Sequence, residues 1–75
     1  MKYDLMIRFN ENSFIDLRNS ETFKELANWK KFGTKGFRGF CTLDKEDIEK
    51  LLIETFKLDS KDFQVVKATG LYVPN

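Results

Sequence analysis

Residues 3–9, Tyr-Asp-Leu-Met-Ile-Arg-Phe, carry an alternating side-chain pattern. Every second side chain of a strand points to the same face, so one face would carry four apolar residues: Tyr3, Leu5, Ile7 and Phe9. The other face would carry Asp4, Met6 and Arg8. A period of two is typical of a strand that is buried on one face and solvated on the other. The pattern therefore restricts the fold to one in which this strand keeps an open face.

Two later segments have the spacing of amphipathic helices. Residues 20–32 predict a helix that begins after the cap residue Ser20 and stops at Gly33. Its apolar stripe would comprise Phe23, Leu26, Ala27 and either Trp29 or Phe32. Residues 44–58 predict a second helix, because Asp44 is a strong N-cap. Its apolar face would comprise Ile48, Leu51, Leu52 and Phe56.

Further strands are expected at residues 37–43 and 63–68. In the first, the core face would carry Phe37, Cys41 and Leu43, and the open face Arg38, Phe40 and Thr42. Residues 14–18 are either a hairpin partner of the first strand or an early helical turn. After the last strand, Gly70 predicts a bulge or turn before residues 71–73, and Pro74 ends the structure.

The expected order of elements is β-(β)-α-β-α-β, in one domain that spans residues 1–75. Strands that alternate with amphipathic helices, each with a single apolar stripe, imply a small sheet covered by helices on one face. We therefore expect an α+β fold: a small open-faced sandwich of three to four strands with two helices on one face. A ferredoxin-like arrangement is the first candidate. The exposed face of the sheet would then be the natural working surface.

The segment 32–43 holds three of the four glycines and three of the eight phenylalanines. Within it, Lys35-Gly36-Phe37 followed by Gly39-Phe40-Cys41-Thr42-Leu43 resembles the RNP1 signature of RRM domains, with Arg38 inserted. The predicted helices on either side resemble those of an RRM as well, and the resemblance implies a sheet that binds RNA.

Two departures argue against membership of the RRM family. An RRM has a strand between its first helix and RNP1, and the residues around Thr34 leave no room for one. The inserted Arg38 also places Phe37 and Phe40 on opposite faces of the strand, unless a bulge at Gly39 brings the rings to one side.

Net charge does not point to a particular partner. The formal net charge is +1, so no global field would draw the chain to nucleic acid or to a membrane. Local charge is uneven, because residues 24–38 hold five Lys and Arg against one Glu, whereas residues 44–62 hold seven acids against four lysines.

A cytoplasmic, non-enzymatic protein is the expectation from the rest of the composition. The single Cys41 excludes an internal disulfide, and the chain shows no secretory segment and no apolar run long enough to span a membrane. Without histidine there is no Ser–His or Cys–His pair to activate a nucleophile, and no Cys/His zinc site. We therefore expect no catalysis, no metal and no cofactor.

Two binding functions remain open. The first is a small inhibitor or regulator that occupies a larger protein partner, through hot-spot residue types such as Trp29, Arg38 and Phe40 or through an unpaired edge strand at 63–68. The composition is rich in Lys, Asn and Phe, which is associated with AT-rich genomes, and it favours an origin in a phage or mobile element.

The second is a platform for single-stranded RNA or DNA, in which cations alternate with aromatic side chains. Its residues would be Arg8, Lys35, Arg38 and Phe40. A symmetric homodimer is compatible with either function. The full set of candidate binding residues is Arg8, Trp29, Lys30, Lys31, Lys35, Phe37, Arg38 and Phe40.

Overall fold

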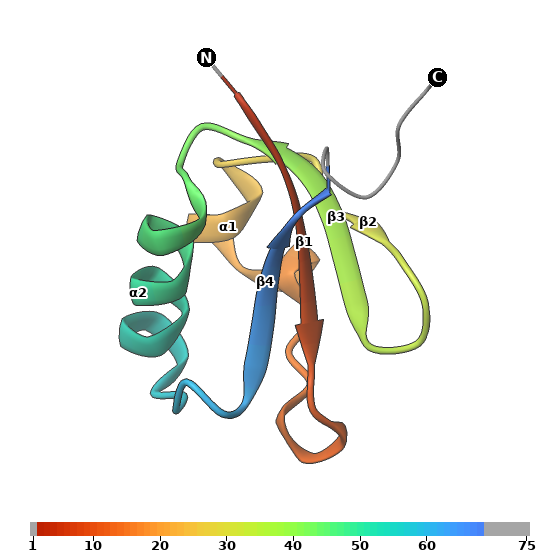
Figure 1. The fold of residues 1–75 in the computed structure, drawn as a ribbon, viewed down its shortest axis with the longest axis vertical. Helices are drawn as coiled ribbons and strands as arrows, with labels where there is room; N and C mark the ends of the chain where they lie inside the picture. The colour runs from red at the N-terminus through yellow and green to blue at the C-terminus, as the bar shows by residue number, and fades with distance from the viewer. Residues whose placement is uncertain (1, 69–75) are drawn as a thin grey trace.

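The computed structural model describes residues 2–68, which form a sheet with helices on one side (Figure 1). The strands of this part of the chain are β1 (Tyr3–Phe9), β2 (Lys30–Lys31), β3 (Gly36–Cys41) and β4 (Phe63–Lys67). The helices are α1 (Glu21–Lys24) and α2 (Lys45–Phe56), and 3₁₀ turns lie at Glu11–Ser13 and Leu17–Asn19. The predicted turn at Gly70, the segment 71–73 and Pro74 lie outside the described residues.

The strands lie in the order β2-β3-β1-β4, and every neighbouring pair is antiparallel. Each helix therefore joins two strands that run in the same direction with a third strand between them. This β-α-β-β-α-β connectivity is that of the ferredoxin-like, split-βαβ architecture. The predicted α+β open-faced sandwich is confirmed, with the fourth strand after α1 and not before it.

One face of the sheet forms the core with the helices. Leu5 and Ile7 of β1 and Phe37 and Cys41 of β3 have no exposed surface, and Phe9 is only 3% exposed. The helices and loops add Leu17, Phe23, Trp29, Ile48 and Leu52 to the same cluster. Burying a large apolar side chain contributes about 1.5–3 kcal/mol, so this face supplies most of the stability.

The second helix begins where the sequence predicts. The Asp44 carboxylate accepts the backbone N–H of Lys45 at 2.6 Å, and the Asp44 carbonyl accepts the N–H of Ile48 at 3.0 Å. The helix ends at Phe56, since Lys57 adopts the left-handed conformation with φ 59°. The predicted helix at 44–58 is thus confirmed, with an end slightly before the predicted one.

The predicted helix at 20–32 is wrong beyond its first turn. Ser20 does cap α1, but α1 ends at Lys24. The Trp29 indole N–H donates to the backbone carbonyl of Phe23 at 2.8 Å, and the indole is buried in the core. The chain is therefore extended after Trp29 and forms β2, so the expected lack of room for a strand here is also wrong. Packing of the indole and pairing with β3 override the helical spacing.

β3 pairs with β1 through six consecutive residue pairs, so Gly39 forms no bulge. Phe37 and Phe40 consequently lie on opposite faces, as the alternation predicts. The strand ends at Cys41, before its predicted end. Residues 14–18 form no strand and lead through extended chain into the second 3₁₀ turn, so the hairpin alternative for this segment is excluded.

Candidate binding surface on the open sheet face

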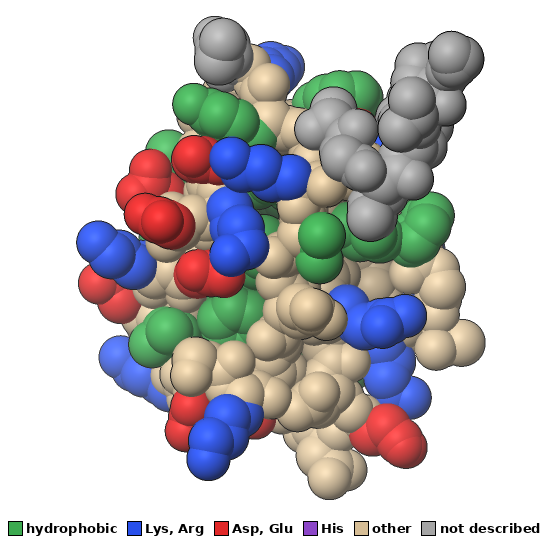
Figure 2. Space-filling view, in the orientation of Figure 1, with side chains coloured by type: hydrophobic (Ala, Val, Ile, Leu, Met, Phe, Trp, Pro, Cys, Tyr) green, Lys and Arg blue, Asp and Glu red, His purple; other side chains and the backbone are tan. Residues whose placement is uncertain are grey.

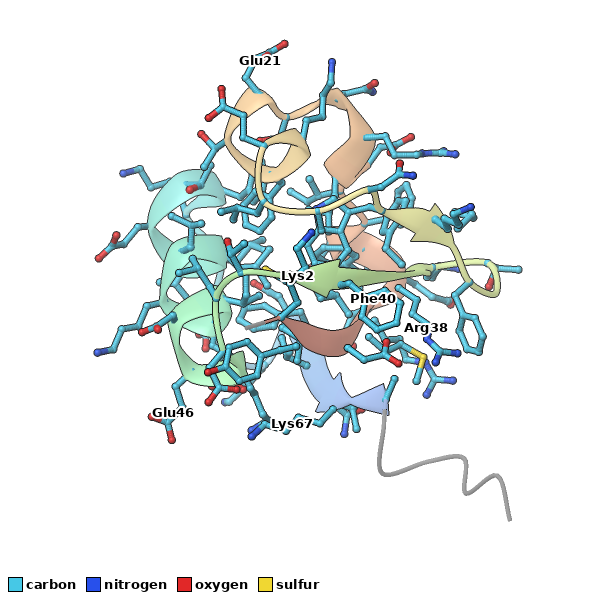
Figure 3. The ribbon with its side chains drawn as sticks, turned by 90° about the horizontal axis from the view of Figure 1, so that it is seen from above. Lys2, Glu21, Arg38, Phe40, Glu46 and Lys67 are labelled. Carbon is cyan, nitrogen blue, oxygen red and sulfur yellow. The ribbon has the colours of Figure 1, made fainter. Side chains whose placement is uncertain are left out.

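The face of the sheet that points away from the helices is called the open face here. Strand alternation and register place on it Asp4, Met6 and Arg8 of β1, Lys30 of β2, Arg38 and Phe40 of β3, and Gln64 and Val66 of β4. Figure 3 shows the side chains of Arg38 and Phe40 side by side, on the side of the sheet away from α2. The prediction that an aromatic side chain stands beside a cation on an open sheet face is confirmed.

The open face is positively charged. Within the described strands, three cations (Arg8, Lys30 and Arg38) accompany a single acid, Asp4. Figure 2 shows acidic side chains gathered over α2, at the left of the view. The uneven charge along the sequence therefore appears in space as an excess of cations on the open face and an excess of acids, with lysines among them, on α2 (Figure 2).

Asp4 and Arg38 form a bidentate ion pair on the open face. Arg38 Nε donates to Asp4 Oδ1 at 3.0 Å, and Arg38 Nη2 donates to Asp4 Oδ2 at 2.8 Å. The Asp4 side chain is 2% exposed and the Arg38 side chain 33%. Two parallel charge-assisted bonds fix the plane of a guanidinium. The charge of Arg38 is thus neutralised by Asp4, so the net positive charge of the face comes from Arg8 and Lys30.

A shallow hollow of about 650 Å³ lies beside Phe40 and is called the Phe40 hollow. Phe32 and Phe40 are among its lining residues and are 50% and 59% exposed. Lys2, Lys30 and Lys31 line this hollow too, all three are exposed, and none of them forms an ion pair within residues 2–68. Exposed aromatic rings next to such lysines offer one surface for planar groups and one for anions.

A second hollow of about 570 Å³ lies at the end of the sheet where β1 stops and the β2–β3 turn begins, and is called the Arg8 hollow. Its polar lining includes Arg8, Asn10, Glu11 and Lys35. Phe32 lines this hollow as well as the Phe40 hollow. The two hollows therefore adjoin at one exposed aromatic side chain.

Trp29 and Phe37 are not part of the candidate site, because both side chains lie in the core. Trp29 is 4% exposed, and its ring packs so closely on Gly39 that a Cβ there would lie 2.9 Å from the Trp29 Cε3 atom. Phe37 is fully buried, with the ring of Phe14 stacked at 5.8 Å and the Arg18 guanidinium at 5.4 Å. Neither side chain can serve as a surface anchor.

Lys31 also lies apart from the open face. It pairs with Phe37 across the β2–β3 ladder and so points to the opposite side from its neighbour Lys30. Its Nζ donates to the carbonyl of Thr34 at 2.9 Å and lies 5.4 Å from the centre of the Phe14 ring. These contacts tie the side chain to the rim of the core. Of the candidate residues, the open face thus gathers Arg8, Lys30, Arg38 and Phe40, with Lys35 in the adjoining turn.

Phe32 is a site residue that the helical interpretation of residues 20–32 missed. It follows β2, and its N–H donates to the carbonyl of Gly36 at 2.9 Å, which continues the ladder by one pair. Gly33 has φ +75° in the turn between these residues. A short glycine-bounded segment between two extended runs is typical of a hairpin, and that signal in Gly33-Thr34-Lys35-Gly36 would have placed Phe32 on a strand.

Other reactive groups give no second site. Burial raises the pKa of the Cys41 thiol above its ordinary value, so the thiol stays protonated. Across residues 2–68, no group of three or more His, Cys, Asp and Glu side chains is arranged to hold a metal ion. Over the same residues, no helix has the length and apolar character needed to cross a membrane.

Comparisons of the chain with protein-family models, with curated proteins and with solved structures found no match.

Proposed function

We propose that the open face binds single-stranded nucleic acid, and that the chain is a non-enzymatic, cytoplasmic binding protein. The observation that carries this proposal is Phe40, which stands 59% exposed on a sheet face and shares its hollow with Phe32 and Lys30. Aromatic rings on which bases stack, next to cations that meet phosphates, are the common features of single-strand binding surfaces.

The energetics favour weak, salt-sensitive binding. Stacking of one base on an aromatic side chain contributes about 1–3 kcal/mol. Each lysine or arginine that neutralises a phosphate releases a counterion, and log K falls with log[salt] by about 0.7 for each such contact on a single strand. Two or three cations on this face would give a shallow but measurable salt dependence, although the chain as a whole is nearly neutral.

Fluorescence anisotropy with labelled eight-nucleotide U and dT oligomers, at low and moderate salt, tests this function. The expected result is salt-sensitive binding that Phe40→Ala weakens roughly 5- to 150-fold and that Lys30→Ala weakens less. Ile53→Ala and Lys50→Ala are matched controls, because both residues are exposed on α2. Emission from the buried Trp29 shows that each variant is folded. Binding that is unchanged in Phe40→Ala, or no binding at all, would refute the proposal.

A protein partner is the second candidate, and one observation favours it. β4 is an edge strand of five residues, and no described segment pairs with its outer side. The opposite edge, β2, is only two residues long and consists of two lysines, which is a common way to block unwanted pairing. An edge that no segment of residues 2–68 covers suits an inhibitor or regulator that adds its sheet to a strand of a larger protein.

A pull-down from bacterial lysate with wild type and Val66→Lys tests the second candidate. A lysine at this position of β4 is expected to discourage strand addition, so a stoichiometric protein captured by wild type should be lost in the variant. Light scattering on the purified chain separates this outcome from a homodimer. Repeated recovery of no stoichiometric protein would count against a protein partner.

A further inference from the structure

The two hollows of the open face are joined by Phe32. This side chain is 50% exposed and lines the Phe40 hollow on one side and the Arg8 hollow on the other. Phe32 is aligned with Gly36, which lies four residues from Phe40 along β3. Four residues of strand span roughly 13 Å. The two exposed rings therefore stand on backbone positions at different points along the open face, an arrangement that suits different bases of one strand.

Cations converge on the Arg8 hollow from two separate segments. Arg8 comes from β1 and Lys35 from the β2–β3 turn, and Glu11 is the acid among the described lining residues. Arg8 pairs with Gly36 across the β1–β3 ladder. Because glycine has no side chain, nothing at position 36 separates Arg8 from the hollow. A Cβ at Gly36 would lie 2.8 Å from the Phe32 carbonyl oxygen and 3.0 Å from that of Ile7. The backbone geometry therefore keeps the floor of this hollow bare.

The walls of the Arg8 hollow are held in place by backbone bonds. The N–H of Phe9 donates to the carbonyl of Lys35 at 2.8 Å, and the N–H of Phe32 donates to Gly36 at 2.9 Å. The N–H of Asn10 donates to the carbonyl of Asp62 at 2.9 Å. These bonds tie the β2–β3 turn and the chain before β4 to the end of β1. A ligand that enters this hollow meets a preformed site, which lowers the cost of binding.

We infer that the Arg8 hollow is the second half of a single nucleic-acid track, in which one strand stacks on Phe40, passes Phe32 and places a phosphate between Arg8 and Lys35. This inference rests on the proposed function and extends it to a length requirement. A dinucleotide would occupy one hollow, whereas a strand of about four nucleotides or more would reach both. Arg38 is not counted among the phosphate contacts of the track, because its guanidinium is bonded to Asp4.

The test measures anisotropy with labelled dT and U oligomers of two, four and eight nucleotides on wild type, Arg8→Ala, Phe32→Ala, Phe40→Ala and the control Lys50→Ala. Wild type should bind the eight-mer at least tenfold more tightly than the two-mer. Arg8→Ala and Phe32→Ala should each weaken eight-mer binding more than two-mer binding and so remove most of this length dependence, with the smaller effect on the two-mer for Arg8→Ala, because Phe32 lines both hollows. Arg8→Ala should also lower the salt slope by about 0.7. Lys50→Ala should change nothing.

The outcomes separate this inference from the proposed function. Eight-mer binding that is lost in Phe40→Ala but retained in Arg8→Ala and Phe32→Ala would overturn the track and leave the function standing. No binding by wild type would overturn both. Equal competition by a poly-glutamate peptide of the same charge would also overturn both, because it would show a surface that binds any anion. A difference between dT and U identifies which kind of strand the track prefers.

Discussion

The two phenylalanines of β3 have opposite environments, although they are only three residues apart on one regular strand. Phe37 is fully buried and contacts the ring of Phe14 and the guanidinium of Arg18. Phe40 is 59% exposed on the other face. Both residues have the same extended backbone conformation. Their exposure differs because helices and loops pack on only one face of the sheet. A side chain on the covered face contributes to stability, whereas one on the open face is available for binding at little cost to the fold.

Substitution of these two phenylalanines gives the largest expected contrast. Phe37→Ala should lower the free energy of unfolding by about 3–5 kcal/mol, because it removes a core ring and leaves a cavity. Phe40→Ala should change it by no more than about 0.5 kcal/mol, as is usual for an exposed position. Urea titration followed by Trp29 emission measures both values. Similar losses for the two variants would break the comparison, since Phe40 would then be a structural residue.

The ion pair on the open face sharpens the comparison, because here the open face does contribute to stability. Arg38→Ala should lower the free energy of unfolding by about 3 kcal/mol, since it leaves the Asp4 carboxylate, 2% exposed, without its bidentate partner. The double variant Asp4→Ala/Arg38→Ala should recover much of this loss, because no buried charge then remains. A double-mutant cycle in urea measures the coupling, and additive losses would contradict a structural role for the pair.

How far the fold could be predicted from the sequence depended on whether local and tertiary signals agreed. In residues 3–9 the alternation and the final packing demand the same faces, and at Asp44 the cap and the apolar stripe of α2 agree. In residues 20–32 the signals conflicted. The spacing of Phe23, Leu26 and Ala27 is helical, but the Trp29 ring packs against Gly39 of β3, which is distant in the sequence and adjacent in space. Local spacing holds no information about that contact.

The candidate site was predictable where strand alternation alone decides it. Arg38 and Phe40 face outward because they alternate with Phe37 and Cys41, and the sequence contains that alternation. The Asp4–Arg38 pair was not predictable, because it depends on the register of β1 against β3. Phe32 was missed for the same reason as β2. A two-residue strand has no periodicity of its own, and only its pairing with β3 defines it.

The smallest expected effect concerns the ion pair on the covered side of the sheet. Lys67 Nζ lies 3.4 Å from Asp44 Oδ1, and both side chains are about half exposed, unlike Asp4. The hydrogen bond from the Lys45 N–H, helped by Lys67, holds the pKa of Asp44 below its ordinary value. Because the pKa is lower in the folded state, the ionised carboxylate stabilises the fold at pH values above the ordinary pKa of aspartate. This stabilisation is lost as the pH falls through the folded-state pKa.

Asp44→Asn should therefore lower the melting temperature slightly near pH 6, and the difference from wild type should shrink as the pH falls through the lowered folded-state pKa of Asp44. Asparagine keeps the capping oxygen, so the variant isolates the charge from the cap. Thermal melts of both proteins across this pH range measure the effect. A difference that stays constant with pH would show that the carboxylate acts through hydrogen-bond geometry alone. The contribution of Asp44 to stability would then come from the geometry of its hydrogen bond, as it does for the bidentate Asp4–Arg38 pair. The two ion pairs would differ in how deeply their carboxylates are buried and not in how their charges act.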